Sequence, residues 1–197
     1  MKLFLTSLLL IAALAAPAAN NPAVESMQRK LDRIQANGES AHPRPLTTTM
    51  TEQEVNAYVA SGRVRLPKGV QSARFSGKPG VVDSVARVDF DQLTAGQRSA
   101  NPLLSMFSGV HEVAITAHAS GAQGVGHVHI DSVALDGVQI PDFVLQMFVN
   151  HYIKPKHPNL GIDNTFQLPD RIDSAAVGNH ELTVWASTRS GPAISTA

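Results

Sequence analysis

The side chains best suited to chemistry are histidines and acids that alternate along two expected strands. His127 and His129 stand two residues apart and so share one face of a strand, which Asp131 continues. Antiparallel pairing with the preceding strand would bring Glu112 opposite Asp131 and His118 diagonal to His127. Side chains of these types bind zinc. A solvated strand face has the same pattern, and this simpler interpretation predicts no metal and no other cofactor.

The motifs of hydrolases are absent or incomplete. The sequence contains no Gly-x-Ser-x-Gly elbow and no Ser-x-x-Lys pair. His-Glu pairs at 111–112 and 180–181 begin like a zinc-protease helix, but Ile115 and Val184 occupy the position of the second histidine. Both pairs also fall in expected strands, where residues four apart do not converge on one ion.

Two aspartates resemble a glycosidase pair at first sight. Asp89 and Asp91 share one strand face, as paired carboxylates would. Arg87 alternates with them, which is typical of a face in contact with solvent. We therefore predict no catalytic residue, and a histidine-based metal hydrolase is the least favoured alternative.

The first residues predict export. Lys2 precedes an apolar run at 3–15, and residues 16–18 are Ala-Pro-Ala, with small residues at the spacing that signal peptidase reads. A run of about 13 residues is too short to cross about 30 Å of hydrocarbon as a helix. We expect cleavage near Ala19 and a periplasmic or secreted protein, with an uncleaved anchor as the alternative. The sequence has no cysteine, so it can form no disulfide.

Composition narrows the class of partner. The chain carries 16 basic and 16 acidic residues. Nucleic-acid binding requires a basic field, so we expect no nucleic-acid partner. Only one tryptophan is present, Trp185, and aromatic residues make up 5% of the chain. The expected core is therefore built mainly from aliphatic and β-branched side chains.

Local patterns predict two N-terminal helices. The first carries one apolar stripe, made by Val24, Met27, Leu31 and Ile34. Residues 38–49, with two prolines, are interpreted as a linker. Thr51 and Glu54 form a capping box, which predicts a helix from there to Ser61. The expected organisation is a signal peptide at 1–18, a helix and linker at 19–45, one α+β domain at 46–187 and a flexible tail at 188–197.

Alternating apolar residues predict a first hairpin. Its strands are 70–76 and 81–90, joined by a four-residue loop, so that Arg74 faces Asp83 and Phe75 faces Val82. This register leaves one apolar face and one charged face on the hairpin.

A second hairpin is expected from strands 110–119 and 125–135 around the loop 120–123. In this register Thr116 faces His127. The apolar positions change parity along the second strand, which predicts a bulge near Asp131.

The C-terminal half adds a helix and short strands. Asp142 is expected to cap a helix over 143–153, which is apolar around most of its circumference and therefore has to be buried or face something apolar. Short strands are expected at 164–168, 171–177 and 181–186. The whole pattern predicts an antiparallel sheet of at least four strands with this helix on its apolar face.

Two segments carry a family resemblance. Residues 51–59 (Thr-Glu-Gln-Glu-Val-Asn-Ala-Tyr-Val) and 133–142 (Val-Ala-Leu-Asp-Gly-Val-Gln-Ile-Pro-Asp) resemble segments of small bacterial envelope proteins related to the tubular lipid-binding (TULIP) group. The similarity covers roughly residues 46–186. It implies a curved antiparallel sheet of two or more hairpins, packed against one or two helices, with lipid held between them.

The combined expectation is a protein that binds a lipid or other apolar ligand without catalysis. We expect peripheral membrane contact as a further possibility, and the sequence identifies no protein partner. The first alternative is a structural or interaction module of the cell envelope that uses a sheet edge or the loop 93–109. The expected ligand-binding wall comes from the apolar faces and consists of Phe75, Val82, Val88, Phe90, Ile115, Leu145 and Phe148.

Overall fold

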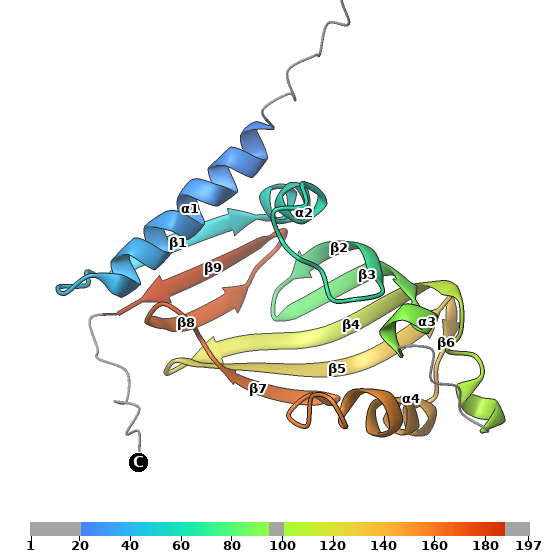
Figure 1. The fold of residues 1–197 in the computed structure, drawn as a ribbon. Helices are drawn as coiled ribbons and strands as arrows, with labels where there is room; N and C mark the ends of the chain where they lie inside the picture. The colour runs from blue at the N-terminus through green and yellow to red at the C-terminus, as the bar shows by residue number, and fades with distance from the viewer. Residues whose placement is uncertain (1–20, 95–100, 188–197) are drawn as a thin grey trace, which may run out of the picture.

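Antiparallel strands form the frame of the molecule (Figure 1). The structure is a computed structural model and describes residues 21–94 and 101–187. Within these residues, nine strands form one open curved sheet and four α-helices accompany it. The fold is therefore α+β with a curved antiparallel sheet, as the sequence predicted. The expected signal peptide at 1–18 and the expected tail at 188–197 lie outside the described residues.

The sheet is built around its longest strand, β4. Its main path runs β1-β9-β8-β4-β3-β2, while β5 pairs with β4 and carries β6 and β7. The strands are β1 (Leu46–Thr51), β2 (Val70–Lys78), β3 (Val81–Asp89), β4 (Val110–Ala122), β5 (Val125–Leu135), β6 (Val138–Gln139), β7 (Asp163–Gln167), β8 (Ile172–Val177) and β9 (Glu181–Ala186).

One edge of β4 serves two different hairpins. β5 takes the opposite edge, and β3 pairs with β4 from Val110 to His118. β8 then pairs with the same strand at Ser120 and Gly121. The β2–β3 and β8–β9 hairpins therefore leave β4 side by side and diverge (Figure 1). We call this divergence the fork.

The helices begin where capping side chains satisfy their free N–H groups. The Asn21 side chain caps α1 (Pro22–Glu39). The predicted capping box is confirmed, because Thr51 and Glu54 exchange hydrogen bonds at the start of α2 (Glu52–Ala60). Three short elements follow, α3 (Phe90–Leu93), the 3₁₀ turn η1 (Pro102–Leu104) and α4 (Asp142–Phe148), and one π-helical turn, η2 (Val149–Ile153), continues α4. No helix in the described parts of the chain is long and apolar enough to span a membrane.

The buried side chains form two separate clusters. The larger cluster joins β3, β4 and β5 to α4, η1 and η2, and it contains Val88, Phe90, Leu104, Phe107, Val113, Val133, Leu135, Ile140, Val144, Phe148 and Tyr152. The smaller cluster joins α1 to β1, β8 and β9, and it contains Met27, Ile34, Met50, Ile172 and Val184. The apolar stripe of α1 is thus part of the folded body.

A buried carboxylate connects α1 to α2. Glu54, which is 8% exposed, accepts hydrogen bonds from Ser26 Oγ at 2.6 Å and from Lys30 Nζ at 2.7 Å. Burial alone raises the pKa of Glu54, but the hydrogen bonds from Lys30, Ser26 and the Thr51 N–H, with the charge of Lys30, lower it to about 2. Glu54 is therefore ionised at neutral pH and holds the two helices together.

The predicted register of the first hairpin is wrong by two residues. Phe75 pairs with Ser84 instead of Val82, and Val82 pairs with Gly77. The cause is a two-residue turn at Pro79-Gly80 in place of a four-residue loop, with Gly80 at φ 73°. A shift of two residues keeps every side chain on its face, so the apolar face is as expected.

The second hairpin also closes more tightly than predicted. Its turn consists of Gln123 and Gly124, which both have positive φ, as a type I′ turn requires. His127 consequently pairs with Ser120 instead of Thr116. The register shifts at Asp131, where the change of parity called for a bulge.

Three further expectations change. β1 begins at Leu46, inside the expected linker, because β9 supplies a full-length antiparallel partner. Pro141 precedes α4 without a side-chain cap, and Asp142 is its first residue instead of its cap. Phe143 is 60% exposed, so the helix is not buried all round.

Candidate functional site

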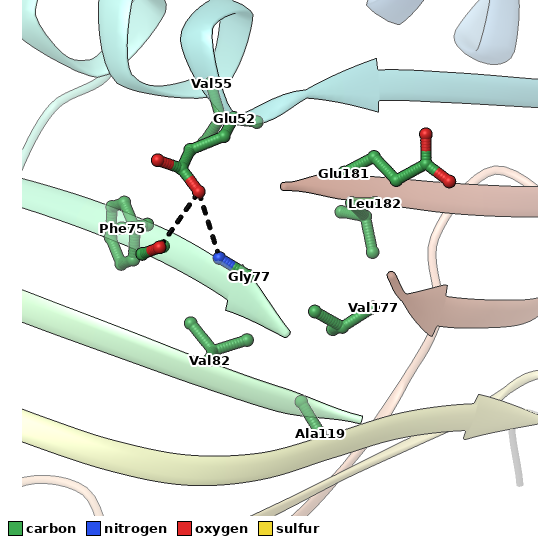
Figure 2. A pocket seen from close by; sticks show the side chains of 10 residues that line it. Glu52, Val55, Phe75, Gly77, Val82, Ala119, Val177, Glu181 and Leu182 are labelled. Atoms are coloured by element: carbon green, nitrogen blue, oxygen red, sulfur yellow. Dashed lines mark hydrogen bonds between the residues drawn. The ribbon is translucent and has the colours of Figure 1, made fainter. Parts of the chain in front are cut away.

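An apolar pocket of about 250 Å³ lies at the fork, beneath the start of α2 (Figure 2). Every element of the fork contributes to it, and its surface is almost entirely apolar. We call this hollow the fork pocket. Its lining residues are Glu52, Val55, Phe75, Ser76, Gly77, Val82, Ala119, Val177, Glu181 and Leu182.

The pocket exists because the two hairpins are joined only at their turns. The Gly80 N–H donates to the Val177 carbonyl at 3.0 Å, and the His180 N–H donates to the Gly77 carbonyl at 2.9 Å. The Ala119 N–H donates to the Gly80 carbonyl at 3.0 Å. These bonds fix the distance between the hairpins at the fork, but they supply no side chain to fill the space behind it.

Helix α2 covers the free edge of β2 above the pocket. The Asn56 amide pairs with the backbone of Phe75 in both directions, each bond being 2.8 Å long. The side chain thus replaces a neighbouring strand and satisfies edge groups that would otherwise be unpaired. Val55, on the same helix, is brought over the fork as part of the pocket wall.

Glu52 is one of three polar residues that line the pocket, with Ser76 and Glu181. Its Oε2 accepts from Ser76 Oγ at 3.0 Å and from the Gly77 N–H at 3.1 Å, and Nδ1 of His180 lies 2.6 Å from it. The hydrogen bond from His180, followed by that from the Gly77 N–H, lowers the pKa of Glu52. The carboxylate is therefore charged at neutral pH.

The seven residues expected to form one ligand wall are divided between two places. Phe75 and Val82 line the fork pocket. Val88, Phe90 and Phe148 are at most 7% exposed in the larger core. Ile115 and Leu145 pack against that core.

Aromatic contacts fill the space where the ligand was expected. The Phe148 ring centroid lies 4.2 Å from that of Phe107 and 5.7 Å from that of Phe90. Phe107 comes from the irregular segment before β4, which the sequence patterns did not place in the core. The face beside α4 is therefore a packed interior.

Pocket residues that the sequence patterns missed come from distant parts of the chain. Val177 and Leu182 belong to the last hairpin, and Ala119 lies at the end of a predicted strand. Each is an ordinary apolar strand residue. The pairing of β8 with β4 at two residues, together with the bonds between the two hairpins, brings Val177 and Leu182 to the fork, and no local signal indicates that pairing.

The histidines and acids that were expected to share one strand face (Glu112, His118, His127, His129 and Asp131) are arranged differently in the structure. His118 pairs directly with His129, and Glu112 pairs with Arg87 on β3, away from Asp131. His118 Nδ1 lies 2.8 Å from Asp131, and His129 contacts Asp163, which raises the pKa of His129. Among the residues the structure describes, no three His, Cys, Asp or Glu side chains are grouped so that they could hold a metal ion.

Two larger hollows have more polar linings. One of about 530 Å³ lies over His118, His127 and His129, and another of about 1020 Å³ is lined in part by Arg74 and Arg87. The fork pocket differs from both in its almost wholly apolar wall, which makes it the best candidate for binding an apolar group.

Comparisons with known proteins add no assignment. No family model, no curated protein and no solved structure matches this chain. Function is therefore inferred from the fork pocket and its surroundings.

Proposed function

We propose that this chain is an exported cell-envelope protein that binds a small apolar ligand in the fork pocket and carries out no catalysis. The observation that carries the proposal is an apolar hollow beside the smaller core. Val55 and Leu182 of its wall pack against the smaller core, while Phe75 and Val82 come from the β2–β3 hairpin. Placing an apolar group in an unfilled apolar space is favourable, because the group replaces water or empty space with close atomic contacts.

The size of the pocket limits the ligand. An engineered apolar cavity of about 150 Å³ binds benzene, so about 250 Å³ suits a ring or one short chain. It does not suit a complete two-chain lipid. Removing about 200 Å² of apolar ligand surface from water contributes at most about 5 kcal/mol, so the dissociation constant should be no smaller than roughly 0.2 mM.

Two further parts of the proposal, the family relationship and export from the cytoplasm, are drawn from the sequence. The proposed relationship to the TULIP group rests on the sequence segments 51–59 and 133–142. The charged, apolar and small-residue sequence at 1–18 supports export to the periplasm or beyond.

Export predicts a processed N-terminus. The mature protein recovered from the cell envelope should begin within a residue or two of Ala19, because signal peptidase cuts after the Ala-Pro-Ala segment. N-terminal sequencing of that material tests this directly. Mature protein that still begins at Met1 would contradict it.

Filling the pocket should abolish binding at little cost in stability. Val82 lines the fork pocket, so a larger ring at this position can occupy the hollow itself. Val82→Phe should therefore lose binding of 1-octanol, an uncharged probe, while the free energy of unfolding changes by less than about 1 kcal/mol. NMR titration of the backbone amides and urea unfolding measure the two effects.

Val88→Phe is the matched control for this change. Val88 is 7% exposed in the larger core, so an added ring overpacks it and costs about 1–3 kcal/mol. Octanol binding at the fork should persist in the folded fraction. If the wild type binds no octanol and both variants lose stability equally, the fork is an ordinary core and the binding proposal is wrong.

That result would favour the second candidate, an interaction module with protein or membrane contact. Its support is an exposed apolar group near α4, in which Leu103, Met106 and Phe143 are 46%, 39% and 60% exposed. Leu103 and Met106 lie in the loop before β4, the segment expected to meet a partner. Large exposed apolar side chains that cluster are typical of interaction surfaces.

A further inference from the structure

A groove of about 1020 Å³ lies on the face of the β2–β3 hairpin opposite the fork pocket. Phe75 lines the fork pocket and Arg74 lines the groove, because successive side chains of a strand point to opposite faces. Helix α2 and the segment 62–66 that follows it form the other wall (Figure 1). We call this hollow the arginine groove, after Arg74 and Arg87 in its lining. It shares no lining residue with the fork pocket.

The two arginines lie close together on one strand face. Arg74 pairs with Val85, and Arg87 lies two residues beyond Val85 on β3, so all three side chains are on the same face. Arg74 and Arg87 are thus diagonal neighbours, at a Cα spacing of roughly 7–8 Å that long side chains can bridge. An anion placed between them would be attracted by both charges.

Both guanidinium groups have donors left for a ligand. Arg74 makes no hydrogen bond or ion pair with the described residues. Arg87 donates from Nε to Oε1 of Gln71 at 3.1 Å, which restrains its side chain, while its two Nη groups bind no described residue. The planar fork of an arginine matches the paired oxygens of a carboxylate or a phosphate.

The acids nearby do not neutralise this pair. Glu112 is the one acid among the described residues that line the groove, and it forms no ion pair there with Arg87, its neighbour across β3 and β4. The Asp136 carboxylate is occupied by His111 and by the Glu112 N–H. Residues 55–82, which supply most of the groove, contain lysines and arginines but no acid. The groove therefore carries net positive charge.

Apolar side chains are exposed beside the arginines. Val64 and Val85 line the same groove and are 38% and 44% exposed. Leu66 extends this apolar part on the segment that follows α2. Binding sites for small molecules combine such apolar wall with a few polar groups that fix the orientation of the ligand.

We propose that the arginine groove is a second binding site, which takes a small organic anion with an apolar part. The carboxylate or phosphate of the ligand lies between Arg74 and Arg87 and accepts hydrogen bonds from both. Its apolar part covers Val64 and Val85. This site does not depend on ligand binding in the fork pocket, because the two hollows lie on opposite faces of the hairpin.

The test compares hexyl phosphate, hexanoate, 1-hexanol and inorganic phosphate in NMR titrations at pH 7 and low ionic strength. Hexyl phosphate and hexanoate should shift the backbone amides of Gly62, Val64 and Arg87, and the doubly charged phosphate should bind more tightly. 1-Hexanol should leave these amides unshifted. Inorganic phosphate should bind at least fivefold more weakly than hexyl phosphate, because it cannot cover the two valines.

Substitutions at the groove separate a site from general attraction. Arg74→Gln and Arg87→Gln should each weaken hexyl phosphate binding about three- to fivefold. Glu112→Gln should strengthen it about twofold, since a like charge leaves the wall. Arg33→Gln is the matched control, because Arg33 is exposed on α1 outside the groove lining. It removes the same charge and should leave the affinity within about 1.5-fold of the wild-type value.

Three results would overturn the proposal. Hexyl phosphate could leave the groove amides of the wild-type protein unshifted. The control variant could weaken binding as much as Arg74→Gln and Arg87→Gln, which would indicate attraction by net charge alone. Inorganic phosphate could bind as tightly as hexyl phosphate, which would mean that the apolar side chains take no part. Shifts by 1-hexanol confined to Ala119, Val177 and Leu182 report on the fork pocket and leave the conclusion for the groove unchanged.

Discussion

Replacing Phe148 with aspartate should unfold the domain. The ring is 6% exposed and contacts three other aromatic rings, those of Phe90, Phe107 and Tyr152, at centroid distances of 4.2 to 5.7 Å. Aspartate removes these contacts and places an unpaired charge in the larger core, at a cost of several kcal/mol. Because a domain of this size is stable by only about 5–15 kcal/mol, far-UV circular dichroism and urea titration should show a largely unfolded protein at 37 °C.

Phe143→Asp provides the control on the same helix. Phe143 is 60% exposed, so the same substitution five residues earlier should change the free energy of unfolding by less than about 1 kcal/mol. A folded Phe148→Asp protein with normal stability would mean that α4 does not pack on the sheet. Equal losses in the two variants would contradict the orientation of the helix.

The second large effect is expected at Glu54, and it should depend on pH. Glu54→Gln leaves Lys30 without its partner and removes a charge-assisted network between α1 and α2. A pKa lowered from 4.5 to about 2 sets an upper limit of about 3 kcal/mol on this contribution. We expect a loss of about 2–3 kcal/mol at pH 7, measured by urea unfolding.

The direction of the pH dependence follows from the lowered pKa. Below pH 4.5 the carboxylate begins to protonate in the unfolded chain, while it stays ionised in the folded protein down to about pH 2. The stabilisation is therefore complete above about pH 5.5 and is lost as the pH falls from 4.5 towards 2. The difference between wild type and Glu54→Gln should shrink over that range, and a constant difference would contradict the assignment. Glu25→Gln, which breaks an exposed pair with Arg63, should cost less than about 1 kcal/mol at any pH.

Sequence patterns succeeded where the determinants are local. The Thr51 and Glu54 side chains are three residues apart, so the capping box at the start of α2 is a local interaction. Alternation likewise identified the apolar face of the first hairpin, because side chains in a strand change face at every residue. The bounds of β9, 181–186, also agree with the expected strand.

The registers failed because turn length depends on backbone conformations that the sequence left ambiguous. Gly77 and Gly80 bracket a segment that suits either a four-residue loop or a two-residue turn. Gln123 adopts φ 54°, which is uncommon for a residue other than glycine. Nothing in the local sequence requires that conformation, and residues 120–123 suit a four-residue loop equally well.

The candidate site was only half predictable for a different reason. Phe75 and Val88 lie on the same apolar face, yet one lines a pocket and the other lies in a core. What separates them is long-range pairing: β8 joins β4 beside β3, and Phe107 fills the other end of the face. Strand β1 was not predicted for the same reason. Its residues Thr47, Thr48 and Thr49 form a strand by pairing with β9, which is distant in the sequence.

The fork allows the width of its pocket to change while both cores stay intact. Most ligand pockets are enlarged by trimming buried side chains, which costs packing energy. Here the spacing of the walls is set by the turn between β8 and β9, beside which Val177 and His180 hold the hairpins together through backbone hydrogen bonds to Gly80 and Gly77. Insertions in turns are tolerated far better than cavities in cores. Homologues that differ in the length of this one turn would carry pockets of different width on the same scaffold.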